Sequence, residues 1–133
     1  MGVKRTPLDN LLAQSDIVSL HVPLNSETRA LMGAAQFDLM QPHALLVNTC
    51  RGPVVDEVAL IDALRQNKIA GAALDVLAQE PPAADNPLLT MENVLLSPHI
   101  AGVTRDTWAR RGEFIFANLK RVWNGEAPQA VIA

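Results

Sequence analysis

The residues best suited to chemistry are an arginine, two carboxylates and a histidine that lie at or just beyond the ends of apolar segments: Arg51, Asp75, Glu80 and His99. Together they offer a cation, a base and an acid, which are the groups that proton transfer and charge stabilisation require. A single charged residue at such a position means little, because strand ends are usually polar. A complementary set is a candidate active site, provided that the fold brings its members together.

The elements that must position these groups are short segments of nearly continuous apolar residues, at 17–22, 44–48, 71–76 and 94–97. This pattern is typical of strands that are buried on both faces of a parallel sheet. We therefore expect four such strands, with the chemically active residues following their carboxyl ends.

Helical patterns separate the apolar segments. Residues 8–14 predict a short helix, and residues 27–40 predict a helix that is broken at Gly33. Residues 56–67 show a clearer helical pattern than these two segments, because Asp56 can cap the start of the helix. Its expected apolar face consists of Val58, Ile61 and Leu64.

The longest helical pattern covers residues 104–124, with Thr104 as the expected cap and Gly125 as the stop. Its apolar stripe consists of Trp108, Ile115, Leu119 and Val122. Residues 77–92 contain three prolines and should form an extended loop over the sheet edge.

Strands that alternate with helices indicate an α/β fold with right-handed crossovers. We expect half of a doubly wound, Rossmann-like parallel sheet, with about four strands, flanking helices and a long C-terminal helix. Ligands of open parallel sheets bind beyond the carboxyl ends of the strands, which is where the candidate residues lie.

Composition excludes several classes of function. The net charge is −3, the basic residues are scattered and aromatic residues make up 4% of the chain, so we expect no nucleic-acid partner. The single cysteine, Cys50, cannot form an internal disulfide. Because a signal peptide and a membrane-spanning apolar run are both lacking, we expect a cytoplasmic protein without a membrane partner.

Sequence motifs at the strand ends resemble those of the D-isomer-specific 2-hydroxyacid dehydrogenases, a family that includes phosphoglycerate dehydrogenases. The similar segments are NTCRG at 48–52, ALDV at 73–76 and SPHIAG at 97–102, and HVPL at 21–24 is similar as well. Their order and spacing fit from about residue 8 to residue 125. The resemblance implies an NAD-dependent oxidoreductase that transfers hydride between nicotinamide and a D-2-hydroxy acid or 2-oxo acid.

The resemblance also implies roles for individual residues. Arg51 corresponds to the arginine that clamps the substrate carboxylate, for which paired guanidinium donors are suited. His99 corresponds to the general acid/base, and Glu80 to the carboxylate that orients this histidine and favours its protonated form. Asp75 corresponds to the residue near the nicotinamide carboxamide.

The cofactor implied is NAD, although the chain does not discriminate NAD from NADP. The cofactor-binding positions that follow from the resemblance are Val22, Pro23, Thr28, Thr49, Cys50, Arg51, Asp75, His99 and Gly102. No metal is expected, because the three histidines do not show ligand spacing. We expect Cys50 to be a packing residue, His21 to be hydrogen-bonded at a strand end, and His43 to lie in an exposed turn.

The resemblance further implies a truncated relative, because no G-x-G-x-x-G fingerprint for the pyrophosphate occurs in the chain. Residues 1–103 would be the second half of the NAD-binding domain, and residues 104–133 a helix and tail that return to the substrate domain. We expect the isolated chain to be nearly inactive. We also expect it to form a homo-oligomer, through the exposed strand edge at 17–22 or through the C-terminal helix.

Two alternatives stay open, and a third is weaker. The same fold could serve as a non-catalytic binding or assembly module, or the chain could be an inert truncated remnant. The intact set of Arg51, Glu80 and His99 favours an enzyme origin. A protease dyad of Cys50 with His99 is a poor alternative, because no third orienting group is evident.

Overall fold

The computed structural model describes residues 2–131 of the chain. The chain divides into two compact units, Met1–His99 and Ile100–Ala133. Residues 1, 132 and 133, which the sequence assigned to the first domain and to the C-terminal tail, lie outside the described residues.

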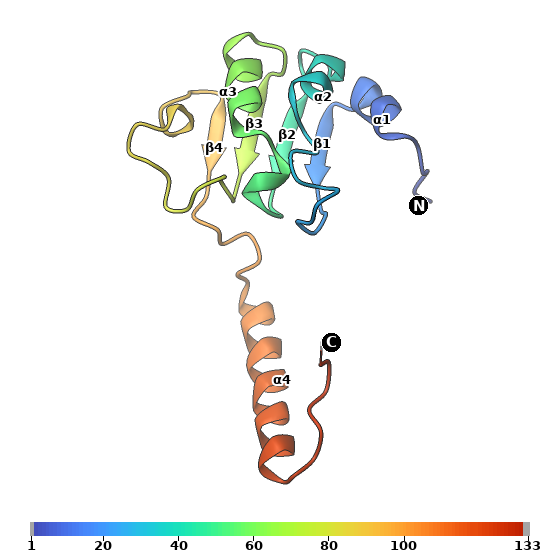
Figure 1. Ribbon diagram of the computed structural model, residues 1–133, viewed down its shortest axis with the longest axis vertical. Helices are drawn as coiled ribbons and strands as arrows, with labels where there is room; N and C mark the ends of the chain where they lie inside the picture. The colour runs from blue at the N-terminus through green and yellow to red at the C-terminus, as the bar shows by residue number, and fades with distance from the viewer. Residues whose placement is uncertain (1, 132–133) are drawn as a thin grey trace. The chain divides into compact units, whose positions relative to one another are not determined.

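The first unit is built on a parallel sheet, as the sequence predicted. Its strands are β1 (Ile17–Leu20), β2 (Leu45–Asn48), β3 (Gly71–Leu74) and β4 (Val94–Leu96), and they lie side by side in chain order. All the pairings are parallel, and one row of the register runs through Val18, Leu46, Ala72 and Val94. The four carboxyl ends therefore meet at one edge (Figure 1).

The helices of this unit are α1 (Leu8–Gln14), α2 (Ala34–Leu39) and α3 (Glu57–Arg65). The side chain of Asp56 accepts a hydrogen bond from the Ala59 amide at 3.2 Å, which confirms the predicted cap of α3. The helices pack on the face of the sheet that Val18, Leu46 and Leu74 point to, and these side chains belong to one buried core.

The strands β1, β2 and β4 are not buried on both faces, which corrects the prediction from their apolar character, whereas β3 is buried at all positions but the partly exposed Ala73. Ile17 is 61% exposed, Leu45 42% and Leu95 72%, whereas their neighbours along β1 and β2 are buried. Successive right-handed crossovers in one direction place every connecting helix on the same side of the sheet. The described residues therefore leave the apolar side chains of the other face uncovered.

Two helix predictions also need correction. Residues 27–30 form turns, because the Asn25 side chain accepts hydrogen bonds from the amides of Glu27 and Thr28, and Met32 forms an isolated bridge with Val55. Only Ala34–Leu39 is helical. In α3, Val58 is exposed, since the helix turns a different set of residues toward the sheet: Leu60, Ala63 and Leu64.

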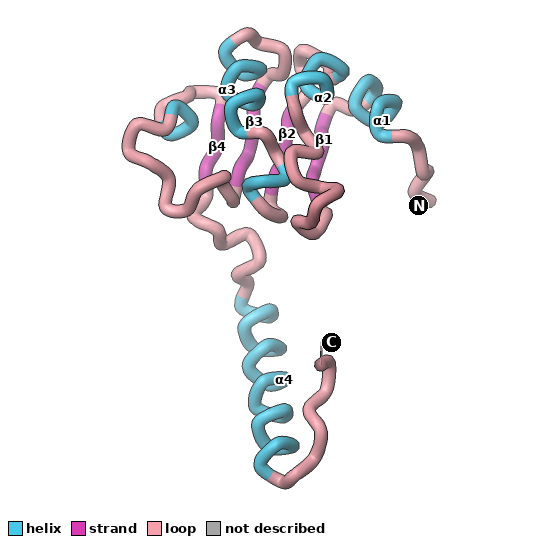
Figure 2. The backbone as a smooth tube through the Cα atoms, viewed as in Figure 1, coloured by secondary structure: helices cyan, strands magenta, loops and turns pink. Residues whose placement is uncertain are grey.

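The loops that follow the strands carry two short 3₁₀ helices, η1 (Gly52–Val54) and η2 (Pro87–Leu89). The second lies within the segment 77–92, which the sequence predicted to be extended throughout. The loops after β2 and β3 begin at the carboxyl edge of the sheet, and Figure 2 draws their irregular parts in pink and their 3₁₀ helices in cyan. The loops after the strands carry the candidate residues of the first unit.

The second unit consists of the helix α4 (Arg105–Trp123) and the segment after it. The Thr104 hydroxyl accepts from the Thr107 amide at 3.1 Å, and Gly125 follows the helix with φ of +76°, so the predicted start and stop are both confirmed. None of its residues is buried, including the predicted apolar stripe. In the part of the chain that the structure describes, no helix combines the length and apolarity needed to cross a membrane.

Candidate active site

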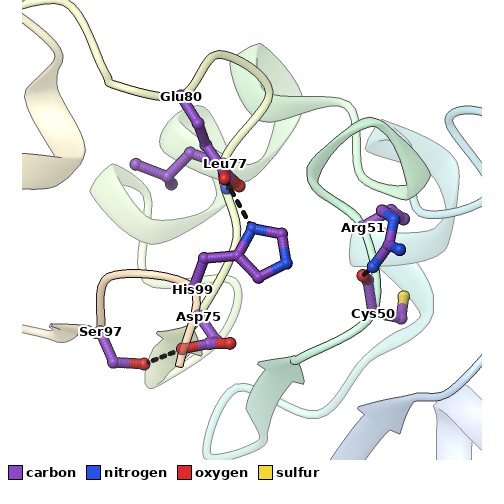
Figure 3. Close-up of polar contacts among 7 residues, drawn as sticks. All are labelled: Cys50, Arg51, Asp75, Leu77, Glu80, Ser97 and His99. Atoms are coloured by element: carbon purple, nitrogen blue, oxygen red, sulfur yellow. Dashed lines mark hydrogen bonds and ion pairs between the residues drawn. The ribbon is translucent and has the colours of Figure 1, made fainter. Parts of the chain in front are cut away.

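A histidine and a glutamate form the centre of the site. His99 Nδ1 donates to Glu80 Oε2 at 2.7 Å, as Figure 3 shows. A carboxylate can only accept, so the proton of this bond resides on Nδ1. Nε2, at the other end of the ring, is then the nitrogen that can exchange a proton with a ligand.

Glu80 is held as a carboxylate by its surroundings. The hydrogen bond from His99 lowers the pKa of Glu80 below its ordinary range, and the Leu77 amide, which donates to Oε1 at 3.0 Å, lowers the pKa further. Desolvation acts in the opposite direction but does not prevail. At neutral pH the glutamate is therefore an anion that holds the imidazole by this hydrogen bond.

The backbone at His99 is fixed by the neighbouring strand. The His99 amide donates to the Asp75 carbonyl at 2.9 Å, and the Ser97 hydroxyl donates to Asp75 Oδ1 at 2.5 Å. Asp75 is 5% exposed, so these bonds are formed away from water. His99 itself has φ of +54°, a left-handed conformation that is uncommon for residues other than glycine and is associated with functional positions.

Arg51 projects from the end of β2, and the buried Asn48 shapes the turn that carries it. Asn48 Oδ1 accepts from the Cys50 amide and thiol, each at 3.1 Å, and Nδ2 donates to the Arg51 carbonyl at 3.1 Å. The exposed guanidinium donates to the Cys50 carbonyl at 2.6 Å. Within residues 2–131, no hydrogen bond or ion pair joins Arg51 to Glu80 or His99, although the close-up shows it across from the imidazole (Figure 3).

A cavity of about 390 Å³ opens beside the histidine–glutamate pair. Asp75, Glu80, Ser97 and His99 are its polar wall, and the remaining side is apolar, with Leu77, Pro81, Pro82, Leu89, Leu96 and Pro98. Such a cavity, apolar with a few convergent polar groups, is typical of a site for a small ligand.

The other predicted cofactor positions lie on separate loops. Thr28 Oγ1 donates to the Pro23 carbonyl at 2.6 Å, so the loop after β1 holds these two residues and Val22 together. Thr49 is exposed at the end of β2. Gly102 belongs to the second unit, and its predicted role rests on the family resemblance alone.

The remaining histidines take up structural positions. His21 Nε2 is 2.8 Å from Ser19 Oγ, as expected for a hydrogen-bonded histidine at a strand end. His43 is exposed and pairs with Asp16 at 2.8 Å. Among the described residues, no group of His, Cys, Asp and Glu side chains is arranged to hold a metal ion.

Sequence reasoning assigned no role to three polar residues that shape the site: Asn48, Glu57 and Ser97. Asn48 lies at the end of an apolar segment, and a buried amide at such a point is a signal for a hydrogen-bonded turn. Glu57 gave no comparable signal, because a glutamate in the first turn of a helix is explained by the helix dipole alone.

Comparison with known proteins places this geometry in a family. Residues 1–101 match the NAD binding domain of the D-isomer specific 2-hydroxyacid dehydrogenases. The chain is 48% identical over 132 residues to the glyoxylate reductase of Korarchaeum cryptofilum (strain OPF8), a match that covers 99% of this chain and 40% of that protein.

Solved structures give the same result. The D-lactate dehydrogenase with NAD+ from Lactobacillus jensenii matches with a TM-score of 0.88 and 35% identity, over 96% of this chain and 42% of that one. An acyclic imino acid reductase in complex with NADPH and D-Arg matches with a TM-score of 0.87 and 34% identity, over 98% of this chain and 41% of that chain. The chain thus spans about two fifths of the length of these relatives.

Proposed function

Because the chain belongs to the D-isomer specific 2-hydroxyacid dehydrogenase family, we propose that it provides the acid–base machinery for the nicotinamide-dependent interconversion of 2-oxo acids and D-2-hydroxy acids. The observation that carries this proposal is the 2.7 Å hydrogen bond between His99 and Glu80, on the sheet edge from which Arg51 also projects. Glyoxylate is the first substrate to test, because the relative from Korarchaeum cryptofilum is a glyoxylate reductase.

In this proposal His99 moves the proton. With Nδ1 bound to Glu80, the protonated ring donates from Nε2 to the carbonyl oxygen of the 2-oxo acid, and in the reverse direction Nε2 accepts the hydroxyl proton. Glu80 fixes the ring orientation and stabilises the imidazolium form. When bound, the nicotinamide supplies or accepts the hydride.

Arg51 binds the substrate carboxylate. Its guanidinium is exposed and presents a fork of donors that matches a carboxylate. Among the described residues, its one side-chain bond is to the carbonyl of the preceding residue. Exchange of that internal bond for the substrate anion would place the 2-oxo group between Arg51 and His99. Reactants held in this way need little further loss of freedom to reach the transition state.

The residues present fit the nicotinamide end of the cofactor. The cavity beside the buried Asp75 combines apolar walls with a carboxylate that can accept from an amide. We assign cofactor contacts to Val22, Pro23, Thr28, Thr49, Cys50, Asp75 and Gly102, and either NAD or NADP is compatible with them. The sequence contains no glycine fingerprint for the pyrophosphate. We further assign residues 1–103 to the cofactor-binding part and residues 104–133 to the helix and tail that return to a substrate domain.

The test is a chimera of the Korarchaeum cryptofilum reductase in which this chain replaces the segment that it matches. We expect the chimera to oxidise NADH with glyoxylate, and His99→Ala to lower kcat about 100-fold or more. His43→Ala is the matched control, because this histidine is exposed and lies outside the cavity. The chain alone should bind NAD weakly and show little turnover.

Two results would contradict the proposal. The first is a folded chimera that reduces no 2-oxo acid, which would favour a non-catalytic module or an inert remnant. The second is a His99→Ala chimera that is as active as its parent.

A further inference from the structure

The segment that leads to Glu80 is held from two sides. Gly52, which follows Arg51, packs directly on the backbone of Leu77 and Ala78: a Cβ added to Gly52 would lie 1.8 Å from the Leu77 carbonyl oxygen. On the other side is Glu57, in the first turn of α3. The loop that carries Glu80 is therefore anchored to the segment that carries Arg51.

Glu57 uses both of its carboxylate oxygens on this loop. Oε2 accepts from the Ala78 amide at 2.8 Å, and Oε1 accepts from the Asn86 side chain at 2.8 Å. Asn86 in turn accepts from the Leu88 amide at 3.0 Å and caps η2. One carboxylate thus fixes the loop on either side of Glu80, two residues before it and six residues after it.

The hydrogen bonds continue from this anchor to the histidine. The Leu77 amide, next to the residue that Glu57 holds, donates to Glu80 Oε1, while Glu80 Oε2 accepts from His99. Glu80 receives no other hydrogen bond from the described residues. Its orientation toward His99 therefore depends on where the backbone at Leu77 and Ala78 lies.

We propose that Glu57 is a positioning residue, which holds the backbone at Leu77 and Ala78 so that Glu80 and His99 form their hydrogen bond. That this pair is catalytic rests on the proposed function, but the positioning itself does not. The contribution of Glu57 is geometric, since its carboxylate bonds neither to Glu80 nor to His99 in the described structure.

The competing explanation is that Glu57 acts only as a negative charge at the amino end of α3, where acidic residues stabilise a helix. The chain offers a matched control for it. Asp56→Asn removes a charge from the same helix end, keeps a good capping side chain and leaves the loop contacts intact.

The test variant is Glu57→Gln, because glutamine can accept only one of the two bonds and turns a donor toward the other partner. The double variant Glu57→Gln/Asn86→Asp reverses one bond: the amide group of the introduced glutamine then donates to the new carboxylate, and the glutamine oxygen is left for Ala78. The double variant therefore keeps both contacts of residue 57 with the loop and moves the negative charge to position 86.

The readouts are NMR signals of the full chain, which need no turnover. They are the solvent exchange of the His99 Nδ1 proton, from the imidazole ¹H–¹⁵N signal, and the titration of the Glu80 carboxyl, from its ¹³C shift. In Glu57→Gln we expect the Nδ1 proton to exchange with solvent about fivefold faster, the effect of one typical net hydrogen bond. The pKa of Glu80 should rise toward its ordinary range, because the bond from His99 that lowers it is weakened.

The controls decide between the two explanations. The proposal requires that Asp56→Asn and the double variant give signals like those of the parent, and that Glu80→Ala, which removes the acceptor, abolishes the Nδ1 bond. It is overturned if Glu57→Gln leaves both readouts unchanged, or if Asp56→Asn alters them equally. If Glu57→Gln does not fold, the double variant alone decides. A double variant that folds but lacks the Nδ1 bond of His99 refutes the positioning role of Glu57. Inactivity of the chimera with these signals intact would count against the catalytic function only.

Discussion

At the scale of single residues, the contacts of Glu80 set its charge state. It accepts hydrogen bonds from a side chain and a backbone amide, and the resulting pKa is lower than that of an ordinary glutamate. The same contacts have two consequences: they orient His99, and they couple the stability of the fold to pH. Asn48 and Asp75 are buried polar residues that similarly fix the turn at Arg51 and the backbone at His99.

The prediction at this scale concerns Glu80→Gln. A group whose pKa is lowered by folding contributes stability above its unfolded pKa, about 4.3 for glutamate, and loses that contribution as the pH falls through the lower folded pKa. We therefore expect the variant to have a lower Tm than the parent at pH 6, with a difference that shrinks as the pH falls below about 4.3. Thermal unfolding followed by circular dichroism from pH 6 to pH 3 measures it.

Glu92→Gln is the matched control for this series, because Glu92 is a glutamate of the same loop region that forms no hydrogen bond or ion pair through its side chain within residues 2–131. Its Tm should stay close to that of the parent throughout. A Glu80→Gln difference that does not shrink as the pH falls from about 4.3 to 3 would mean that the carboxylate does not stabilise the folded chain.

At the scale of elements, the site depends on contact between the loops that follow β2 and β3. Gly52 at the start of η1 lies against the backbone that leads from β3 toward Glu80, and only a residue without a Cβ permits this approach. The caps of α3 and α4 fix where those helices begin, but they do not determine how the loops meet.

Gly52→Ala should therefore destabilise the first unit by about 3 kcal/mol or more, since the clash is with backbone atoms that cannot rotate away. Urea unfolding monitored by circular dichroism gives the change in free energy. The control is Gly112→Ala in α4, where an added Cβ meets nothing within 4 Å and alanine favours the helix. A Gly52→Ala chain as stable as its parent would show that the two loops separate without cost.

For the whole molecule, the main property is the amount of apolar surface that the described residues leave uncovered. One face of the sheet exposes Ile17, Leu45 and Leu95, and α4 buries none of its residues. The strand β1 is also an edge strand, with backbone groups available for pairing. Exposed apolar surface on this scale is typical of a site for association.

We therefore propose that copies of the chain associate, through the β1 edge or through α4. Sedimentation velocity should give a mass above that of one chain, and the fraction of associated chains should rise with protein concentration. Ile115→Lys/Leu119→Lys places charge on the apolar stripe of α4 and should shift the mass toward the monomer if α4 is the contact. Glu113→Lys is the control, on an exposed polar position of the same helix.

The remaining outcomes separate the two surfaces. Association that survives the double substitution but is lost on Ser19→Pro, which disrupts β1 as a pairing edge, would assign the contact to the strand. A parent chain that sediments as a monomer at high concentration would refute association through either surface.

Local sequence was sufficient for the four strands and for several helix ends. The apolar segments predicted all four strands, and Asp56, Thr104 and Gly125 marked helix ends that the structure confirms. These features depend on neighbours a few residues apart, so pattern and capping chemistry determine them. Parallel strands then require the residues after their carboxyl ends to share one edge, which explains why Glu80 and His99 could be expected together. Their catalytic roles remain a prediction.

Only the tertiary structure decided which apolar residues are covered and which polar residues support the site. Ile17 and Leu45 are as apolar as their buried neighbours, but their exposure depends on the side of the sheet to which the crossovers bring the helices. Glu57 looks like an ordinary first-turn glutamate, yet its partners Ala78 and Asn86 lie 21 and 29 residues away. Such contacts are set by the path of the whole chain, because a side chain can bond only to the groups that folding brings within its reach.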